Sequence, residues 1–433
     1  MILRTCAVLV FIAVDLSLYG GVGAQPTSRS ICETCACSPP NATPVMVNCT
    51  CVKTKFLIIR EQDTMLLSGV RDLTLAGCGL VSLPSSGLSG SPLLSRVTVR
   101  DMKLFHYTAG LFPALESLTV EDVGGLVLDG FGPANRTLKQ LVLRRTSVQR
   151  LVRGTIPASA PLQKVMLDRV DVDEIEAGAL DMTFVRGESD GFSIVNSAIK
   201  TIGAGGVLVR SGSVKIINST MDELYAGSVI VEDAKDIRLS GNRLGNVSLV
   251  GDSLSVVRSP PAGAGASTIM VDSNEFMTLP ADLQLFKTDR SVSFINNVVR
   301  DVDLGPFLFG VGPNVRVSNN QFECDCDSRR ISVLKLNQVF PGLLPEADDS
   351  RFAGLLVDNY CKRPNDMSLA GYRDELVAGK ACPGTTLPTA PPTPSTTSAV
   401  DTNDASNGLL PSTWTTLAIT GFCVVTVALS TIS

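Results

Sequence analysis

A short unit recurs along the chain at intervals of about 23 residues, and in each copy two apolar residues flank one variable residue. Internal repeats of this length are typical of solenoids, in which each repeat packs only on its two neighbours. The full unit reads apolar-x-apolar-x-x-(Asn or small)-x-apolar. Clear copies span Leu73–Leu80, Val97–Leu104, Leu141–Val148, Val165–Val172, Phe192–Ile199, Ile237–Leu244, Ile269–Phe276, Val292–Val299 and Val315–Phe322, and fainter ones lie at Leu118–Val120 and Val214–Met221.

Each unit predicts a short strand whose two apolar residues point inward while the residue between them points outward. Stacked units then form a parallel ladder, so we expect an α/β-type solenoid, mostly β, with about 11 coils over residues 61–322. The Asn position suits a side chain that hydrogen-bonds the backbone where the strand turns. It holds Asn242, Asn274, Asn297 and Asn320 in later units, and Thr146, Ser197, Ser219 or Cys78 elsewhere. A second half-repeat, such as EIEAGAL from Glu174, supplies the return side.

The N-terminus indicates a secretory signal peptide over residues 1–24. Arg4 precedes an apolar run from Cys6 to Leu18, and small residues follow up to Ala24. This order is the usual one for a signal that is cleaved after small residues. The alternative is a buried N-terminal helix, although no polar residue follows that would cap it.

The C-terminus predicts a membrane anchor without a cytoplasmic segment. Residues 385–404 are rich in Pro and Thr and suit an extended, O-glycosylated stalk. Small residues, a polar spacer and an apolar tail follow over 405–433, which is the pattern of a glycosylphosphatidylinositol signal. We expect attachment at Ser406 or Asn407, with Asn403 as a weaker candidate. The alternative, a spanning helix, usually carries Lys or Arg on its cytoplasmic side, and none is present here.

The cysteines predict disulfide-bonded caps at both ends of the repeats. The chain has 12 cysteines, of which Cys6 lies in the signal and Cys423 in the tail. The other ten gather in residues 25–60 and 323–384, apart from Cys78. An even set in a secreted chain implies disulfides, and a solenoid needs caps because its terminal coils otherwise expose apolar interior.

These features resemble extracellular leucine-rich-repeat proteins over roughly residues 30 to 384. The segment NQFECDC at Asn320–Cys326, with CKRPNDMSLAG from Cys361 and then Cys382, looks like the cysteine-rich C-terminal flank of that family, and CETCAC with VNC is similar to its N-terminal flank. The resemblance implies the pairs Cys324–Cys361, Cys326–Cys382, Cys32–Cys37 and Cys35–Cys49. Cys51 and Cys78 are additional to the family pattern, and parity suggests that they pair. The alternative is a buried free thiol at Cys78.

The chain departs from the family pattern in three respects. Many units lack Leu at their start, and the tryptophan usual after the Cys-x-Cys pair is replaced by Ile331 and Leu334 nearby. A Pro/Gly/Ala loop from Ser259 to Ser267 stretches one repeat. These departures affect the exact repeat count more than the fold. Right-handed parallel β-helices also stack strands with a period of about 23 residues, so they are the alternative fold, and an extracellular enzyme that acts on polysaccharides is the alternative function.

The residues favour a protein that is not an enzyme. His106 is the sole histidine, so a His-rich metal site is excluded and any Ser–His–Asp arrangement would need this residue. We expect Asp101, Asp122 and Asp168 at equivalent outward positions, with Glu121 adjacent, where paired carboxylates could act on a sugar. Arg100, Arg144, Arg145 and Arg169 interleave with them, which is ordinary for a solvated face. No cofactor is expected, and the net charge of −5 gives no support to nucleic-acid binding.

Sequons for N-glycosylation occur at Asn41, Asn48, Asn135, Asn218 and Asn246, and Asn48 adjoins a cap cysteine. We expect Asn218 to lie beside the strand face, so that its glycan would shield the middle of that face. The first coils have no sequon on their strands. Their outward positions hold a mixed set of charges that we propose as the partner contact: Arg96, Arg100, Glu121, Arg144, Lys164 and Asp168.

The sequence as a whole predicts a cell-surface recognition, adhesion or co-receptor protein that binds another extracellular protein or a second copy of itself. By resemblance, lipid-anchored members of the family often work in cell–cell contact. A protein shed into the matrix is a further alternative.

Overall fold

The computed structural model describes residues 31–39, 43–51, 56–60, 63, 65, 67–82, 88, 91–108, 111–131, 136–156, 158–185, 190–210, 212–234, 236–247, 254–258, 268–279, 290–301, 307, 311–324, 353–363 and 366–381. All of them lie in one compact unit, Met1–Pro388. The predicted signal peptide, stalk and anchor signal lie outside the described residues. So do Asn41, Asn135, Cys326 and Cys382, and the loop between Ser259 and Ser267.

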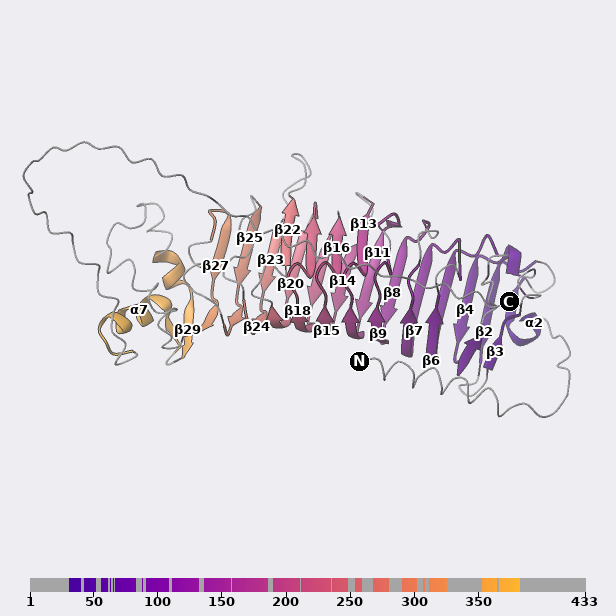
Figure 1. The fold of residues 1–433 in the computed structure, drawn as a ribbon, viewed down its shortest axis with the longest axis horizontal. Helices are drawn as coiled ribbons and strands as arrows, with labels where there is room; N and C mark the ends of the chain where they lie inside the picture. The colour runs from indigo at the N-terminus through magenta and orange to yellow at the C-terminus, as the bar shows by residue number, and fades with distance from the viewer. Residues whose placement is uncertain are drawn as a thin grey trace, which may run out of the picture. The chain divides into compact units, whose positions relative to one another are not determined.

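The described part is a parallel β-solenoid, as the repeats predict. Every unit read from the sequence, including the two fainter ones, lies on its own strand of a first ladder (Figure 1). The ladder runs β4 (Asp72–Ala76), β6 (Arg96–Tyr107), β7 (Ser117–Leu128), β8 (Gln140–Arg144), β11 (Lys164–Asp168), β14 (Gly191–Val195), β17 (Val214–Ile217), β20 (Asp236–Ser240), β23 (Thr268–Asp272), β25 (Ser291–Ile295) and β27 (Val315–Ser318).

A second parallel ladder follows directly after the first around a tight corner. It comprises the later halves of β6 and β7, then β9 (Ser147–Leu151), β12 (Asp171–Ile175), β15 (Ala198–Ile202), β18 (Thr220–Leu224), β21 (Arg243–Val247), β24 (Glu275–Phe276), β26 (Val298–Val299) and β28 (Gln321–Glu323). In the N-terminal coils, β3 (Phe56–Ile58) and β5 (Leu80–Ser82) pair in parallel as a separate two-stranded sheet. A strand and its successor around the corner therefore form two sides of each coil.

A third parallel sheet forms the return side of the middle coils. Its strands are β10 (Pro161–Leu162), β13 (Leu180–Phe184), β16 (Val207–Arg210), β19 (Val229–Glu232) and β22 (Leu254–Arg258). In the described part of these coils, strands form three sides and no helix lies on the return side, which is the arrangement expected of the β-helix alternative. Leucine-rich repeats and β-helices both consist of stacked parallel coils, and the structure establishes this shared feature.

One residue per coil makes the first corner by adopting a left-handed backbone conformation. Its φ lies between 48° and 67° in every coil from Gly77 to Asn319. Asn, Asp and Gly reach this region most readily, and they hold most of these positions: Gly77, Asp101, Asp122, Asn196, Asn218, Gly241, Asn296 and Asn319, against Arg145, Arg169 and Ser273. The turn aims the next residue, at the predicted Asn position, into the core.

The buried asparagines stack along the solenoid and hydrogen-bond from coil to coil. The side-chain oxygen of Asn297 accepts from the backbone N–H of Asn274 (2.9 Å), and its Nδ2 donates to the carbonyl of Val271 (3.0 Å). The same bonds link Ser219, Asn242, Asn274, Asn297, Asn320 and Asn359 in sequence. The predicted role of the Asn position is confirmed, because each amide satisfies backbone groups that the corner removes from the ladders.

Aliphatic residues in register fill most of the interior, and aromatic rings strengthen two regions. Phe294 and Phe307 lie near the C-terminal end with ring centroids 5.8 Å apart in an edge-to-face arrangement, and Phe322 packs against Phe307 in the same way. Tyr107 packs against Phe131 at 4.8 Å in the first coils. Burial of this repeating apolar surface is the main favourable term for the fold.

The N-terminal cap extends the first ladder. Strand β2 (Met46–Thr50) pairs in parallel with β4, while β1 (Ala36–Ser38) covers β2 from outside in antiparallel fashion, next to α2 (Ile31–Thr34). A 3₁₀ turn, η1 (Leu67–Gly69), leads into β4. The disulfides Cys32–Cys37, Cys35–Cys49 and Cys51–Cys78 are present as predicted.

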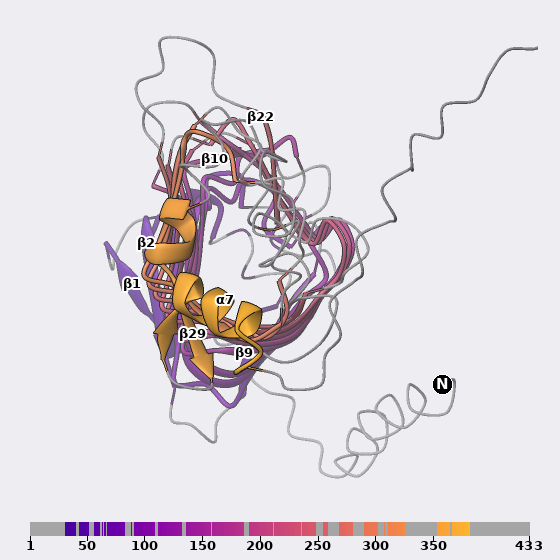
Figure 2. The ribbon, with the colours of Figure 1, turned by 90° about the vertical axis from the view of Figure 1, so that its left-hand side faces the viewer.

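The C-terminal cap closes the opposite end, as Figure 2 shows in the view along the coil. Strand β29 (Tyr360–Arg363) adds to the second ladder beside β28, and β30 (Met367–Ser368) pairs with it in antiparallel fashion. Helix α7 (Leu369–Val377) follows, and the hydroxyl of Ser368 caps it by accepting from the N–H of Gly371 (3.0 Å). The disulfide Cys324–Cys361 ties β28 to β29 as predicted.

Candidate interaction surface

The predicted contact residues lie on four neighbouring strands of the first ladder, and the register arranges their charges in a row. Arg100 of β6 is paired in register with Glu121 of β7, which is followed by Arg144 of β8 and Asp168 of β11. Neighbouring strands are roughly 4.8 Å apart, so the row alternates positive and negative at that spacing. We call the outward residues of β6, β7, β8 and β11 the N-terminal strand face.

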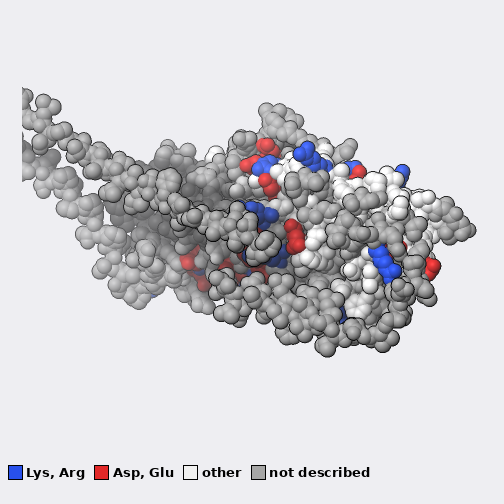
Figure 3. Space-filling view, turned by 45° about the vertical axis from the view of Figure 1, so that its right-hand side comes forward, with Lys and Arg blue, Asp and Glu red and all other residues white. Residues whose placement is uncertain are grey.

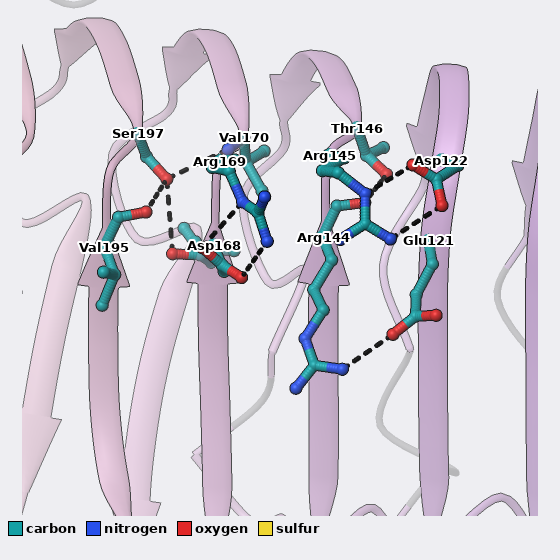
Figure 4. Close-up of polar contacts among 11 residues, drawn as sticks. Glu121, Asp122, Arg144, Arg145, Thr146, Asp168, Arg169, Val170, Val195 and Ser197 are labelled. Carbon is teal, nitrogen blue, oxygen red and sulfur yellow. Dashed lines mark hydrogen bonds and ion pairs between the residues drawn. The ribbon is translucent and has the colours of Figure 1, made fainter.

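Most charges on this face are neutralised by a neighbour. Arg144 donates to Glu121 at 2.8 Å, and Arg169 reaches Asp168 at 3.4 Å (Figure 4). Arg96 holds Asp72 of β4 through two side-chain bonds, one of them 2.9 Å. These pairs are at least partly exposed, so they contribute little to stability, but they orient the side chains over the strands.

Lys164 at the edge of the face pairs with Asp190 at 2.9 Å. The hydrogen bond from Lys164, together with its charge, holds the pKa of the Asp190 carboxyl below its usual range. Arg100 differs from the other predicted residues, because its exposed side chain forms no ion pair or hydrogen bond with any described residue. Among the predicted contact residues, Arg100 is thus the cation that can engage a partner without first breaking a bond.

The corner beside the face carries a second row of charges. Arg145 bonds Asp122 through two contacts, the shorter at 2.5 Å and the other at 2.7 Å (Figure 4). The hydrogen bonds that Arg145 donates to the carboxylate of Asp122 raise the pKa of the Arg145 guanidinium. In the described surface that Figure 3 presents, acidic and basic groups lie next to each other and neither sign dominates.

The expectation that Asp101, Asp122 and Asp168 occupy equivalent positions is wrong. Asp101 and Asp122 are left-handed corner residues, whereas Asp168 ends strand β11, one position earlier in its coil. The corner equivalents in the next two coils are Arg145 and Arg169. Counted from the first apolar residue of its unit, Asp168 is the fourth residue, whereas Asp101 and Asp122 are the fifth, so the repeat itself separates these positions. The carboxylates of Asp122 and Asp168 are also held by arginines rather than by each other.

His106 lies within strand β6, which extends to Tyr107. Its side chain is exposed, and Nε2 lies 2.6 Å from Oδ2 of Asp129. Among the described residues no group of three or more His, Cys, Asp or Glu side chains is arranged to hold a metal ion.

An exposed apolar patch adjoins the N-terminal strand face and was not predicted. Phe56 and Ile58 of β3 are 72% and 59% exposed, and Leu80 of β5 is 41% exposed. Phe56 and Leu80 are in register across the two strands, and Leu104, 43% exposed, lies on β6 beyond the corner from Arg100. We call Phe56, Ile58, Leu80 and Leu104 the apolar patch. Large exposed apolar groups of this kind mark interaction sites in soluble proteins.

The strand face of the later coils is different in composition. Its outward residues include Ser193, Ser240, Thr268, Ser291 and Ser293. Asn218 is exposed at the corner between β17 and β18, beside this face, where the sequence predicted it. Its side chain lies so close to Gly241 of the next coil that a Cβ there would fall 2.4 Å from the amide oxygen.

Other predicted glycosylation sites are less informative. Asn48 lies half-buried on β2, and Asn246 lies on β21. Sequence reasoning also missed Asn359, which accepts from Asn320 and so ends the buried asparagine stack in the cap. The repeat spacing does not reveal Asn359, because this residue lies 39 residues after Asn320.

Comparison with known proteins finds no family model that matches the chain and no matching curated protein. The disulfides indicate an extracellular or secreted protein. In the described part of the chain, no helix is long and apolar enough to cross a membrane.

Proposed function

We propose that this chain is a cell-surface recognition or adhesion protein that binds an extracellular protein through the N-terminal strand face and the adjoining apolar patch. The observation that supports it most is the position of Arg100. This unpaired arginine lies on the same strand as Leu104, so a charged anchor borders exposed apolar side chains. Interfaces commonly combine apolar and aromatic residues with arginine in this way.

The ion-paired residues of the face have a different role in this proposal. Glu121, Arg144 and Asp168 already satisfy one another or a neighbour, so a partner does not have to neutralise them. They keep the face flat and polar around Arg100 and contribute to specificity more than to affinity. This refines the initial hypothesis, which gave Arg100 and Arg144 equal weight.

The proposal includes attachment to the outer leaflet by a glycosylphosphatidylinositol anchor at Ser406 or Asn407, N-glycans at the sequons, and membership of the extracellular leucine-rich-repeat class. The disulfide caps support an extracellular setting. Release of the chain from cells by a phosphatidylinositol-specific phospholipase tests the anchor, and retention after treatment argues for a shed or otherwise attached protein.

A cell-aggregation experiment tests the binding function. Suspension cells that express the full chain are mixed with differently labelled control cells, and pure and mixed clusters are counted. Pure clusters indicate that the chain binds itself, whereas mixed clusters indicate a separate partner on the control cells. If neither pure nor mixed clusters form, the expected partner is a soluble protein. It is then sought by cross-linking to the full chain.

The site is tested with two charge reversals on the same ladder. Arg100→Glu should weaken the observed binding about tenfold or more. Arg238→Glu is the matched control, because Arg238 is exposed on β20 of the first ladder, within the later coils. Equal binding by both variants would refute the assignment of the N-terminal strand face.

A polysaccharide-acting enzyme is the second candidate, and the three-sided coil is the observation that favours it. The pairing of Asp122 and Asp168 with arginines argues against these residues as an acid/base pair. Loss of polysaccharide cleavage in Asp122→Asn or Asp168→Asn, with binding to cells unchanged, would favour the enzyme over the adhesion protein.

A further inference from the structure

A shallow groove lies at the second corner of the solenoid, where the second ladder turns into the third sheet. It has a volume of about 480 Å³ and is lined by Arg153, Glu174, Glu176, Ala177, Gly203, Ala204 and Tyr225. None of these residues belongs to the N-terminal strand face, so the groove is independent of the function proposed above.

The groove arises where a repeated corner lacks one side chain. Glycines 154, 178, 205 and 227 lie in register, linked by N–H···O bonds of 2.7 to 3.0 Å, and all have positive φ. Glu176, Gly203 and Tyr225 each lie two residues before one of the glycines 178, 205 and 227. They therefore occupy equivalent positions in three successive coils. A Cβ on Gly203 would lie 2.9 Å from the backbone nitrogen of Ala177, so close packing keeps this position empty. Ala204 is the small residue that follows it.

Glu176 and Tyr225 thus line the same groove, with Gly203 at the equivalent position of the coil between them. Glu176 and Tyr225 are two coils apart, roughly 9–10 Å along the stack. Tyr225 is 50% exposed, which is unusual for a large side chain in these coils.

The charges that line the groove are balanced and held in place. Arg150 lies beside the groove and pairs with both carboxylates, at 3.2 Å to Glu174 and 2.7 Å to Glu176. The backbone N–H of Arg153 also donates to Glu176 at 2.9 Å, while the guanidinium of Arg153 donates to the carbonyl of Ala177 at 3.3 Å. A charged ligand would have to compete with these pairs, whereas hydroxyl groups can share the remaining donors and acceptors.

We propose that this groove binds a neutral hexose unit of a glycan. The apolar face of the sugar ring would pack on Tyr225, and its hydroxyls would bond the carboxylates of Glu174 and Glu176 and the guanidinium of Arg153. The small residues Gly203 and Ala204 form the floor that admits the ring. Aromatic side chains are suited to such a site because they combine a large apolar face with a polar edge.

The test measures binding of neutral hexasaccharides to the purified full chain by calorimetry and saturation-transfer NMR, after enzymatic removal of N-linked glycans. Separate titrations use hexasaccharides of glucose, mannose, galactose and N-acetylglucosamine, with hexagalacturonate as the charged comparison. We expect at least one neutral sugar to bind and hexagalacturonate to bind more weakly. Failure of all four neutral sugars, or preference for the charged one, would overturn the proposal.

Four variants locate the site. Tyr225→Ala should weaken binding about tenfold, and Tyr225→Phe should retain most of it. Ala204→Arg should abolish binding by filling the groove from an exposed position. Tyr360→Ala is the matched control, because Tyr360 is 38% exposed in the C-terminal cap. Equal binding by Tyr225→Ala and Tyr360→Ala would place the sugar elsewhere and refute this site.

Discussion

The first coils and the last coils share one backbone corner but place different chemistry on it. In the first coils the inward residue after the corner is Cys78, Met102, Val123, Thr146 or Val170, whereas in the last coils it is Asn242, Asn274, Asn297 or Asn320. The outward surface differs as well. Early coils present alternating charges and the apolar patch, whereas later coils combine Ser and Thr with separate charges such as Lys215, Arg238 and Arg316, and carry a sequon.

The comparison shows that coil geometry does not depend on one type of interior. A residue with a left-handed backbone conformation turns the chain in both regions. The interior next to this corner can be filled either by apolar side chains or by amide side chains that hydrogen-bond between coils. The asparagine stack adds directional bonds between coils, so it specifies their register more strictly than aliphatic contacts do. The early coils have no such stack, and the disulfide Cys51–Cys78 ties their first members to the cap instead.

The largest effect should come from breaking the asparagine stack. Asn297→Leu removes the acceptor for the backbone N–H of Asn274 and the donor to the carbonyl of Val271, in a residue with no solvent exposure. Unsatisfied buried groups of this kind should lower the free energy of unfolding by about 4 kcal/mol. Urea unfolding measures the loss, and faster hydrogen exchange at the amide of Asn274 locates it.

Met102→Leu is the matched change at the same position of an early coil. Met102 is buried among apolar residues, so this swap of similar volume should cost less than about 1.5 kcal/mol. Equal losses in the two variants would mean that the asparagine stack has no special role.

Removal of the disulfide at the first coils should have the next largest effect. Cys51 and Cys78 enclose a loop with a separation of 27 residues, and the double variant Cys51→Ala/Cys78→Ala should lose about 3.5 kcal/mol by loop-closure entropy. Because coils contact only their neighbours, hydrogen exchange should accelerate in β2, β4 and β6 but not in β25 and β27. Uniform acceleration along the chain would show that the solenoid unfolds as one cooperative unit.

The corner residues themselves should give the smallest effect. Arg169 has a φ of 56°, close to the 57° of Asn296 in a late coil. Asparagine tolerates this region better than arginine, and the exposed pair between Arg169 and Asp168 contributes little. Arg169→Asn should therefore raise the free energy of unfolding by about 0.5 kcal/mol, and Asn296→Arg should lower it by a similar amount. Changes of the same sign in both variants would contradict this account.

The repeat spacing predicted the solenoid, the strand of every coil and the role of the Asn position. These features follow from local rules, because alternation of apolar residues sets which side chains point inward and each coil repeats the same contacts. The resemblance to extracellular leucine-rich-repeat proteins implied three of the four disulfides that the described residues contain, and parity suggested the fourth, Cys51–Cys78.

The candidate sites were predicted less completely. The sequence placed Arg100, Glu121, Arg144 and Asp168 on one face, and the register confirms that they share a row. It could not show that Arg100 alone lacks a partner among them, because ion pairing depends on how neighbouring coils align side chains. The expected equivalence of Asp168 with Asp101 and Asp122 was wrong by one residue, because Asp168 precedes the corner whereas the other two form it.

The sequence by itself determined the periodic coil, its buried ladders and its disulfide-bonded ends, since these depend on residue types at regular spacing. Only the tertiary structure decided that the return side consists of strands, that Phe56 and Leu80 stay exposed beside Arg100, and that Glu176 and Tyr225 border one groove. Each of these depends on the alignment of residues some 23 or more positions apart in the chain, which is set by hydrogen bonds between coils and not by the order of residues within one coil.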